Sequence, residues 1–170
     1  SKFELSFILL NDKPSALGKH LQEKEINVWE FPPGGKSKWP FTLLKIARLL
    51  QKEKADVIHT HMYIADMLGQ LAGRLAGIKK RVYTRHSSNE SRKYHKKNRI
   101  DRFVNRHCTH VVAISENVKN ILITEENVKP QKIRLIHHGF DLEKFKNVSA
   151  EEVQGLSLKY NPGNKKPVIG

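Results

Sequence analysis

One run of residues, 110–145, limits the fold of this chain more than any other stretch. Its apolar segment 111–114 is short and rich in β-branched residues, as expected of a strand buried on both faces. Ser115 follows as a helix N-cap, and Glu116 places a negative charge in the first helical turn. After this helix, a second apolar segment leads to Gly139, which allows a sharp turn. The run therefore predicts one parallel βαβ unit.

The remaining chain alternates between strand-like and helix-like segments. The polar stretch 87–98 shows no apolar period and is interpreted as a loop. Strands that alternate with helices predict an α/β fold with a doubly wound, mostly parallel, Rossmann-like sheet. We expect further strands at residues 3–10, 26–31, 56–61 and 81–86, and helices at 14–25, from near 40 to 50, and at 64–76, 99–108 and 149–160.

Three glycines, Gly69, Gly73 and Gly77, lie four residues apart in one expected helix. The same spacing occurs in membrane helix dimers, but this helix is short and carries Gln70 and Arg74. We therefore expect the helix to pack closely on the sheet, with Gly77 as its C-terminal cap.

Composition and charge narrow the classes of function. The chain has 170 residues, enough for one domain, and no segment approaches the roughly 20 apolar residues that a membrane helix needs. The formal net charge of +14 predicts an anionic partner, such as nucleic acid, an acidic membrane surface or a phosphorylated ligand. The single cysteine, Cys108, excludes an internal disulfide and suits a reducing compartment, and we interpret it as a buried structural thiol.

Polar residues follow the expected strands where each strand ends. Open parallel sheets bind ligands at the carboxyl ends of their strands, so we expect these residues to line one edge. They are His59, His61, Arg85, His86, Ser115, Glu116, His137 and His138. We expect His59 and His61 to point to opposite faces of their strand, so that the two cannot share a metal ion. Since no carboxylate or thiol is placed to complete a zinc site with His86, no metal site is predicted.

Three stretches carry a family resemblance: residues 56–61 (DVIHTH), 83–86 (YTRH) and, above all, 110–145. Together they resemble the N-terminal domain of the retaining glycosyltransferases of family 4, once called group 1. Those enzymes have the two-domain GT-B fold, so the resemblance implies that this chain forms one half of that fold.

The resemblance also implies how the chain is organised. Residues 1–160 would form the N-terminal, acceptor-side domain, and residues 161–170 a linker and the truncated start of the C-terminal nucleotide-sugar-binding domain. The first strand of the family fold is expected before Ser1. The full enzyme is expected to transfer a hexose, with retention, from a nucleotide diphosphate sugar to a glycan, lipid or small-molecule acceptor. The donor is a substrate, no cofactor is implied, and the chain alone is expected to be inactive.

In the family, the histidine that closes the equivalent of strand 81–86 lies under the donor sugar, which implies a catalytic role for His86. There it would orient the sugar and stabilise charge in an oxocarbenium-like transition state. A hydrogen-bonded structural histidine is the alternative. Helix capping by Ser115 and Glu116 and turn packing by His138 are alternatives at those positions. Substrate contacts are expected from His59, His61, Arg85, Ser115, Glu116, His138 and Gly139.

A basic segment after the expected strand 81–86 is either a solvated surface or a docking site. Its cations are Arg92, Lys93, Lys96, Lys97 and Arg99. Family members often act on lipid-linked or polysaccharide acceptors, so the resemblance implies a cytoplasmic protein at the inner face of the cell membrane. The basic segment would then bind anionic lipid or acceptor. Trp39 and Phe41, beside Lys36 and Lys38, would add an interfacial anchor.

Two other classes of function stay open. Lys and Arg residues interleaved with Tyr94, Phe103 and Trp39 would suit a basic nucleic-acid-binding α/β module without enzymatic activity. The sequence shows no helix-turn-helix or RNA-binding sheet signature, so we expect no specific nucleic-acid partner. The third class is a sugar-binding α/β domain that does not catalyse transfer.

Overall fold

The computed structural model describes residues 3–11, 13, 15–86, 95–145 and 148–163, with the backbone alone at 95–100 and 144–145. The chain divides into two compact units, residues 1–137 and residues 138–170. The expected boundary between a domain at 1–160 and a linker at 161–170 stays a prediction.

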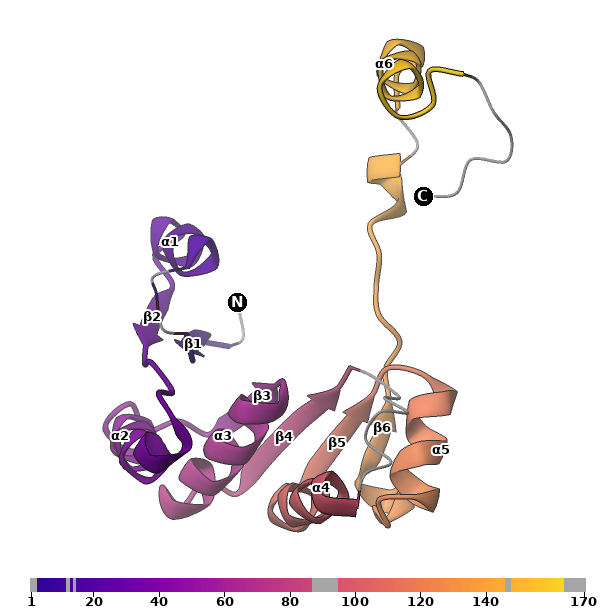
Figure 1. The fold of residues 1–170 in the computed structure, drawn as a ribbon. Helices are drawn as coiled ribbons and strands as arrows, with labels where there is room; N and C mark the ends of the chain where they lie inside the picture. Colours follow the sequence, from indigo (N-terminus) through magenta and orange to yellow (C-terminus); the bar gives the residue numbers. More distant parts are fainter. Residues whose placement is uncertain (1–2, 12, 14, 87–94, 146–147, 164–170) are drawn as a thin grey trace. The chain divides into compact units, whose positions relative to one another are not determined.

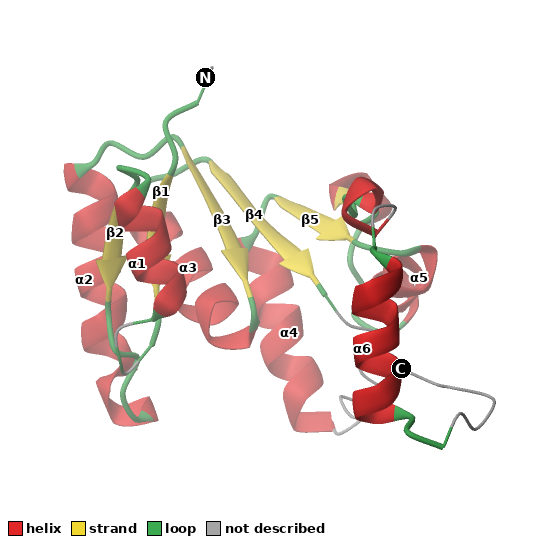
Figure 2. Ribbon diagram, turned by 90° about the horizontal axis from the view of Figure 1, so that it is seen from above, coloured by secondary structure: helices red, strands yellow, loops and turns green. Residues whose placement is uncertain are grey.

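The first unit contains two β-sheets, and the strands within each sheet are parallel. In the smaller sheet, β1 (Ser6–Leu9) pairs with β2 (Asn27–Glu30). The larger sheet has the order β3 (Val57–His61), β4 (Lys80–Arg85), β5 (His110–Ala113) and β6 (Ile133–Leu135). Every pairing is parallel, and Figure 2 shows β3, β4 and β5 running the same way. The predicted parallel α/β fold is confirmed, and so is the βαβ unit, in which β5 and β6 pair side by side.

Helices connect the strands in the predicted order (Figure 1). They are α1 (Ala16–Glu23), α2 (Trp39–Lys52), α3 (Tyr63–Leu75), α4 (His95–His107) and α5 (Glu116–Thr124), with α6 (Ala150–Tyr160) in the second unit. Short 3-10 turns lie at Lys36–Lys38, Pro130–Lys132 and Leu142–Phe145.

Helix α4 begins earlier than its apolar pattern predicts. The expected loop extends to Asn98, but the structure continues the helix back to His95. That part of the expectation was wrong, because His, Lys and Asn residues, which occupy 95–98, are tolerated in a helix that has an apolar face further on. A search for apolar period alone therefore misses such a polar first turn.

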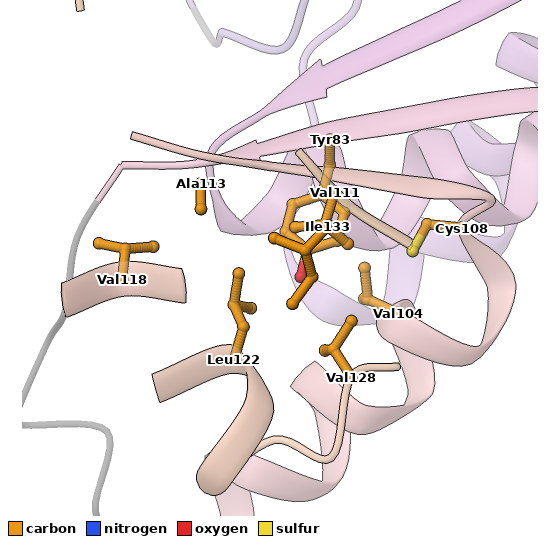
Figure 3. Close-up of a cluster of buried hydrophobic side chains, with 9 residues drawn as sticks. All are labelled: Tyr83, Val104, Cys108, Val111, Ala113, Val118, Leu122, Val128 and Ile133. Carbon is orange, nitrogen blue, oxygen red and sulfur yellow. The ribbon is translucent and has the colours of Figure 1, made fainter. Parts of the chain in front are cut away.

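The larger sheet buries one set of its side chains against helices. Along β3, Ile58 and Thr60 are buried, whereas His59 and His61 are exposed. Figure 3 shows the main cluster, to which β4, β5 and β6 contribute side chains that meet those of α4 and α5. Its members are Tyr83, Val104, Cys108, Val111, Ala113, Val118, Leu122, Val128 and Ile133. Burial raises the pKa of the Cys108 thiol to about 11, which fits the predicted buried thiol.

Two glycines bring α3 close to β3. A Cβ atom at Gly69 would lie 2.5 Å from Cγ2 of Thr60, and one at Gly73 would lie 2.8 Å from Cγ2 of Ile58. Gly77 follows the helix with a φ of 82°, as a left-handed cap requires. The predicted close packing and cap are both confirmed. Within the described segments, no helix is long and apolar enough to cross a membrane.

The second unit contains α6, whose start is fixed by a capping box. The side chain of Ser149 accepts a hydrogen bond from the backbone of Glu152, and the Glu152 carboxylate accepts one from the backbone of Ser149. Serine at the N-cap with glutamate three residues later is the sequence signature of such a box.

Candidate active site

The ends of β3 and β4 bring three histidines together. The strands are parallel neighbours in which His61 pairs with Thr84, so His86 lies just beyond the end of β3. His59 and His61 occupy the same face of β3, because side chains two residues apart in a strand point the same way. The expectation that they point to opposite faces was therefore wrong.

His59, His61 and His86 form one connected group, which we call the histidine cluster. Nδ1 of His61 lies 2.9 Å from Nε2 of His86, which is a hydrogen-bond distance. The ring centroids of His59 and His61 are 4.4 Å apart, and those of His61 and His86 are 5.2 Å apart. Nε2 of His59 lies 2.7 Å from Oγ1 of Thr84. Contacts to Thr84 and His86 therefore tie the two histidines of β3 to the β4 side of the sheet.

The surroundings of His59 and His61 favour uncharged rings. Although the His59 and His61 side chains reach solvent, partial burial of its ring lowers the pKa of His59, and the nearby His86 lowers it further. Burial also lowers the pKa of His61, followed by the effects of His59 and His86. Both rings are therefore neutral at pH 7, and a neutral imidazole offers one N–H donor and one nitrogen acceptor. Such groups suit the hydroxyls of a sugar, each of which can donate and accept.

A buried hydrogen-bond network supports β3 from the other face. The hydroxyl of Thr60 donates to Oδ1 of Asp66 over 2.7 Å, and Nε2 of Gln70 donates to Oγ1 of Thr60 over 2.9 Å. The same Gln70 nitrogen contacts the carbonyl of Val82 at 2.8 Å, so α3 is linked to both strands that carry the cluster. The backbone at β3 and β4 is held firmly beneath the histidines.

Sequence reasoning missed two residues at this site, Thr84 and Met62. Thr84 could have been found from the parallel register, which sets it opposite His61. Met62 joins β3 to α3 with φ 76° and ψ 153°, a combination that residues other than glycine rarely adopt. Nothing in the sequence signals it, because methionine has no preference for that conformation.

Arg85 does not join the histidine cluster. It pairs with Ala113 on the face of the sheet that the helices cover, and its side chain is buried. Its guanidinium contacts Glu126 and lies 3.5 Å from Oδ1 of Asp101. The expected substrate contact at Arg85 therefore conflicts with its position, because strand alternation turns it inward.

The remaining predicted site residues fall into three groups, at the start of α5, in the second unit and in the basic segment. Ser115 caps α5 by accepting from the backbone of Val118 over 3.2 Å, and Glu116 is exposed, 3.2 Å from the Lys119 ammonium. His138 and Gly139 begin the second unit, where the rings of His138 and Phe140 are 6.4 Å apart. Arg92 and Lys93 lie outside the described residues, and at Lys96, Lys97 and Arg99 only the helical backbone is described. Substrate contacts at all these positions stay predictions.

Metal binding by the same group would need its side chains to converge on one point. Among the side chains that the structure describes, no set of three His, Cys, Asp or Glu residues is arranged to hold a metal ion. The contact between His61 and His86 is a direct nitrogen–nitrogen hydrogen bond, so Nδ1 of His61 and Nε2 of His86 bind each other rather than a shared ion.

Comparison with known proteins assigns the chain to a family. Residues 3–144 match the model of Glycosyltransferase Family 4. The chain belongs to glycosyltransferase family 4. The match covers the histidine cluster and most of the βαβ unit, and the resemblance drawn from the sequence is confirmed.

Two curated relatives in the family share part of their length with this chain. A UDP-Gal:α-D-GlcNAc-diphosphoundecaprenol α-1,3-galactosyltransferase of Escherichia coli is 37% identical over 109 residues, which cover 61% of this chain and 28% of that protein. The capsular polysaccharide biosynthesis glycosyltransferase CapH of Staphylococcus aureus is 25% identical over 150 residues, 84% of this chain and 39% of that protein. The chain thus spans well under half of each relative.

Solved structures confirm the family fold. HepE from Anabaena, crystallised in complex with UDP-glucose, superposes with a TM-score of 0.74 at 18% identity, over 94% of this chain and 50% of that one. At this identity the likeness establishes the fold alone. It supports the prediction that this family 4 chain forms one half of a GT-B architecture.

Proposed function

We propose that the protein to which this chain belongs is a glycosyltransferase that moves a hexose from a nucleotide diphosphate sugar to an acceptor. The observation that carries the proposal is the family 4 match over residues 3–144, which includes the histidine cluster. The UDP-Gal in the name of the E. coli relative and the UDP-glucose complex of HepE support this donor class. Because the chain spans less than half of each relative, we expect residues outside it to complete the donor site, and the chain alone to be inactive.

The proposed reaction exchanges one bond at the anomeric carbon of the sugar. The bond from that carbon to the diphosphate oxygen breaks, and its electron pair leaves with the diphosphate. An acceptor hydroxyl oxygen forms the new bond on the same face, and its proton passes to the departing diphosphate. Positive charge develops on the sugar ring, so the site needs positioned polar groups rather than a strong nucleophile.

His86 is the residue that we assign to this task. It follows β4 at the carboxyl edge of the sheet, where open parallel sheets bind ligands. Its ring belongs to a cluster whose other two rings, those of His59 and His61, have lowered pKa values and are neutral at pH 7. We propose that His86 contacts the donor sugar and orients its anomeric carbon.

The test uses the complete protein with a panel of nucleotide diphosphate sugars. Release of nucleoside diphosphate with one donor would identify the sugar, and His86→Ala should lower turnover about a hundredfold or more. His110→Ala is the matched control, since His110 is an exposed histidine at the start of β5, outside the cluster. No release with any donor, with or without membrane extract, would contradict the proposal and favour a binding domain.

We further propose that the acceptor is lipid-linked and met at an anionic membrane surface, at the cytoplasmic face. The E. coli relative is named for a diphosphoundecaprenol acceptor, a class of molecule that resides in membranes. The outer face of α2 supports docking, because Phe41 is 64% exposed and Leu44 is 42% exposed. The ammonium of Lys45 lies 5.0 Å from the centre of the Phe41 ring. Residues 31–52 contain no acidic side chain and five cations, Lys36, Lys38, Lys45, Arg48 and Lys52.

A lipid surface can accept the aromatic and aliphatic side chains of this face while its headgroups attract the cations. Sedimentation of the complete protein with vesicles, with and without anionic lipid, tests the docking. The double variant Phe41→Ser, Lys45→Glu should bind anionic vesicles more weakly than the parent. The control Lys129→Glu, a change in an exposed loop, should weaken vesicle binding less. Equal binding by all three proteins would remove α2 from the proposal.

Replacing Arg92, Lys93, Lys96 and Lys97 with Ser tests the second basic segment in the same assay.

A further inference from the structure

The contact between His61 and His86 joins Nδ1 of the first ring to Nε2 of the second, 2.9 Å apart. We propose that through this contact His61 positions the imidazole of His86, and that it is not itself a ligand of the sugar or the acceptor. The catalytic consequence rests on the proposed function, whereas the positioning of one ring by the other does not.

His61 contacts His86 at a point where the strand itself has ended. The last residue of β4 is Arg85, which pairs with Ala113, and His86 lies beyond it and is exposed. An exposed side chain has several rotamers, and selecting one of them costs conformational entropy. If the ring is already held in one rotamer before substrate binds, binding does not carry that entropy cost.

His61, by contrast, is held from several sides. It is the last residue of β3, paired with Thr84. Its ring lies against that of His59, with centroids 4.4 Å apart and planes inclined by 33°, and His59 is fixed in turn by its contact with Thr84. The preceding residue, Thr60, is buried and hydrogen-bonded to two side chains of α3. A ring that is restrained in this way can restrain its neighbour.

The neutral state of His61 allows its Nδ1 to accept the hydrogen bond. A free neutral imidazole prefers its hydrogen on Nε2. If Nε2–H of His86 donates to Nδ1 of His61, both rings keep that preferred tautomer. Nδ1 of His86 is then a hydrogen-bond acceptor, which matches a donor sugar hydroxyl.

Side-chain replacements at His61 separate positioning from ligand binding. In His61→Asn, the amide oxygen lies roughly where Nδ1 was and can accept from His86. In His61→Gln, the amide reaches roughly the place of Nε2, and His61→Leu offers no polar atom. We expect Asn to retain most of the turnover, and Gln and Leu to lower kcat about tenfold or more with the donor KM changed about twofold at most. His110→Leu is the control, because His110 lies outside the cluster.

A second measurement does not depend on turnover. In the complete protein with ¹⁵N-labelled histidine, Nε2–H of His86 should exchange slowly with water and show a coupling across the hydrogen bond to Nδ1 of His61. Both signals should disappear in His61→Leu, while slow exchange should persist in His61→Asn.

Each outcome decides between the alternatives. An unchanged His86 signal in His61→Leu would overturn the positioning role, even in an active enzyme. Rescue of turnover by Gln but not by Asn would also overturn it, since His61 would then act through Nε2 as a ligand. A protein that releases no nucleoside diphosphate would contradict the proposed function alone, and the ¹⁵N signals would still decide whether His61 holds His86.

Discussion

The guanidinium group of Arg85 donates a hydrogen bond to the carboxylate of Glu126 in the interior of the first unit. Asp101 lies 3.5 Å from the same guanidinium, and Asn105 donates to the second oxygen of Glu126 over 3.0 Å. The hydroxyl of Tyr83 in turn donates to Asn105. This buried network joins the end of β4 to α4 and to the residues after α5, directly beneath the strand end that precedes His86.

Replacing Arg85 with Met should destabilise the protein by about 3–5 kcal/mol, because two buried carboxylates lose their shared cation. Arg85→Lys should cost less, since it keeps the charge but not the planar fork of donors. Urea unfolding of the three proteins measures the difference. If Arg85 were instead a substrate ligand, the Met variant would keep its stability and show a raised KM.

Replacing Gly69 with Ala should lower the free energy of unfolding by about 1–3 kcal/mol. The new Cβ would lie 2.5 Å from Cγ2 of Thr60, whose hydroxyl is fixed by Asp66 and Gln70, so α3 must move away from β3. Gly155→Ala is the matched change in α6, where nothing lies within 4 Å of the added atom. There the helix should gain up to about 1 kcal/mol, seen as increased helicity. Equal stability of Gly69→Ala and the parent would show that α3 is not packed this closely.

Replacing Met62 with Gly should raise the free energy of unfolding by about 1 kcal/mol. Met62 has φ 76° and ψ 153°, a backbone conformation that costs a non-glycine residue about 1–3 kcal/mol. Glycine relieves this strain, but its greater freedom in the unfolded chain takes back about 0.5–1 kcal/mol of the gain. The Met62 side chain is 69% exposed, so its removal alone costs little. Met62→Ala is the control and should show no such gain, because alanine keeps the Cβ. A loss of stability in Met62→Gly relative to Met62→Ala would contradict the strain at this junction.

The histidine cluster should make the fold less stable in mild acid. The pKa values of His59 and His61 are lowered in the folded protein, chiefly by burial, whereas both rings have the ordinary value of 6.5 when unfolded. Between the lowered values and pH 6.5 the unfolded chain binds more protons, so stability is complete above about pH 6.5 and falls as the pH drops below it.

Urea unfolding at pH 7.5 and pH 5.5 tests this dependence. A variant with His59→Gln and His61→Gln should lose less stability between the two pH values than the parent, because neither glutamine titrates. Carboxylates titrate in both proteins, so the difference between the two proteins isolates the histidines. An equal loss in both would show that these rings keep their ordinary pKa in the fold.

The order of strands and helices could be predicted from the sequence, since the signals are local. Apolar period, the capping residue Ser115 and Gly77 after α3 report on neighbouring residues, and the structure bears them out. Because open parallel sheets bind ligands at the carboxyl ends of their strands, the sequence also indicated the sheet edge at which the histidines meet. The start of α4 was not predicted correctly, because a polar first turn carries no apolar signal.

The contacts within the site were decided by tertiary structure. His61 and His86 are 25 residues apart and meet because β3 and β4 pair in one particular register. Arg85 resembled a ligand-binding residue in the sequence, yet strand alternation and the carboxylates of Asp101 and Glu126 place it in the interior. Local sequence determines which segment becomes a strand. Which face a side chain occupies, and what it touches there, depends on helices and strands far along the chain, because only their packing brings those groups within reach.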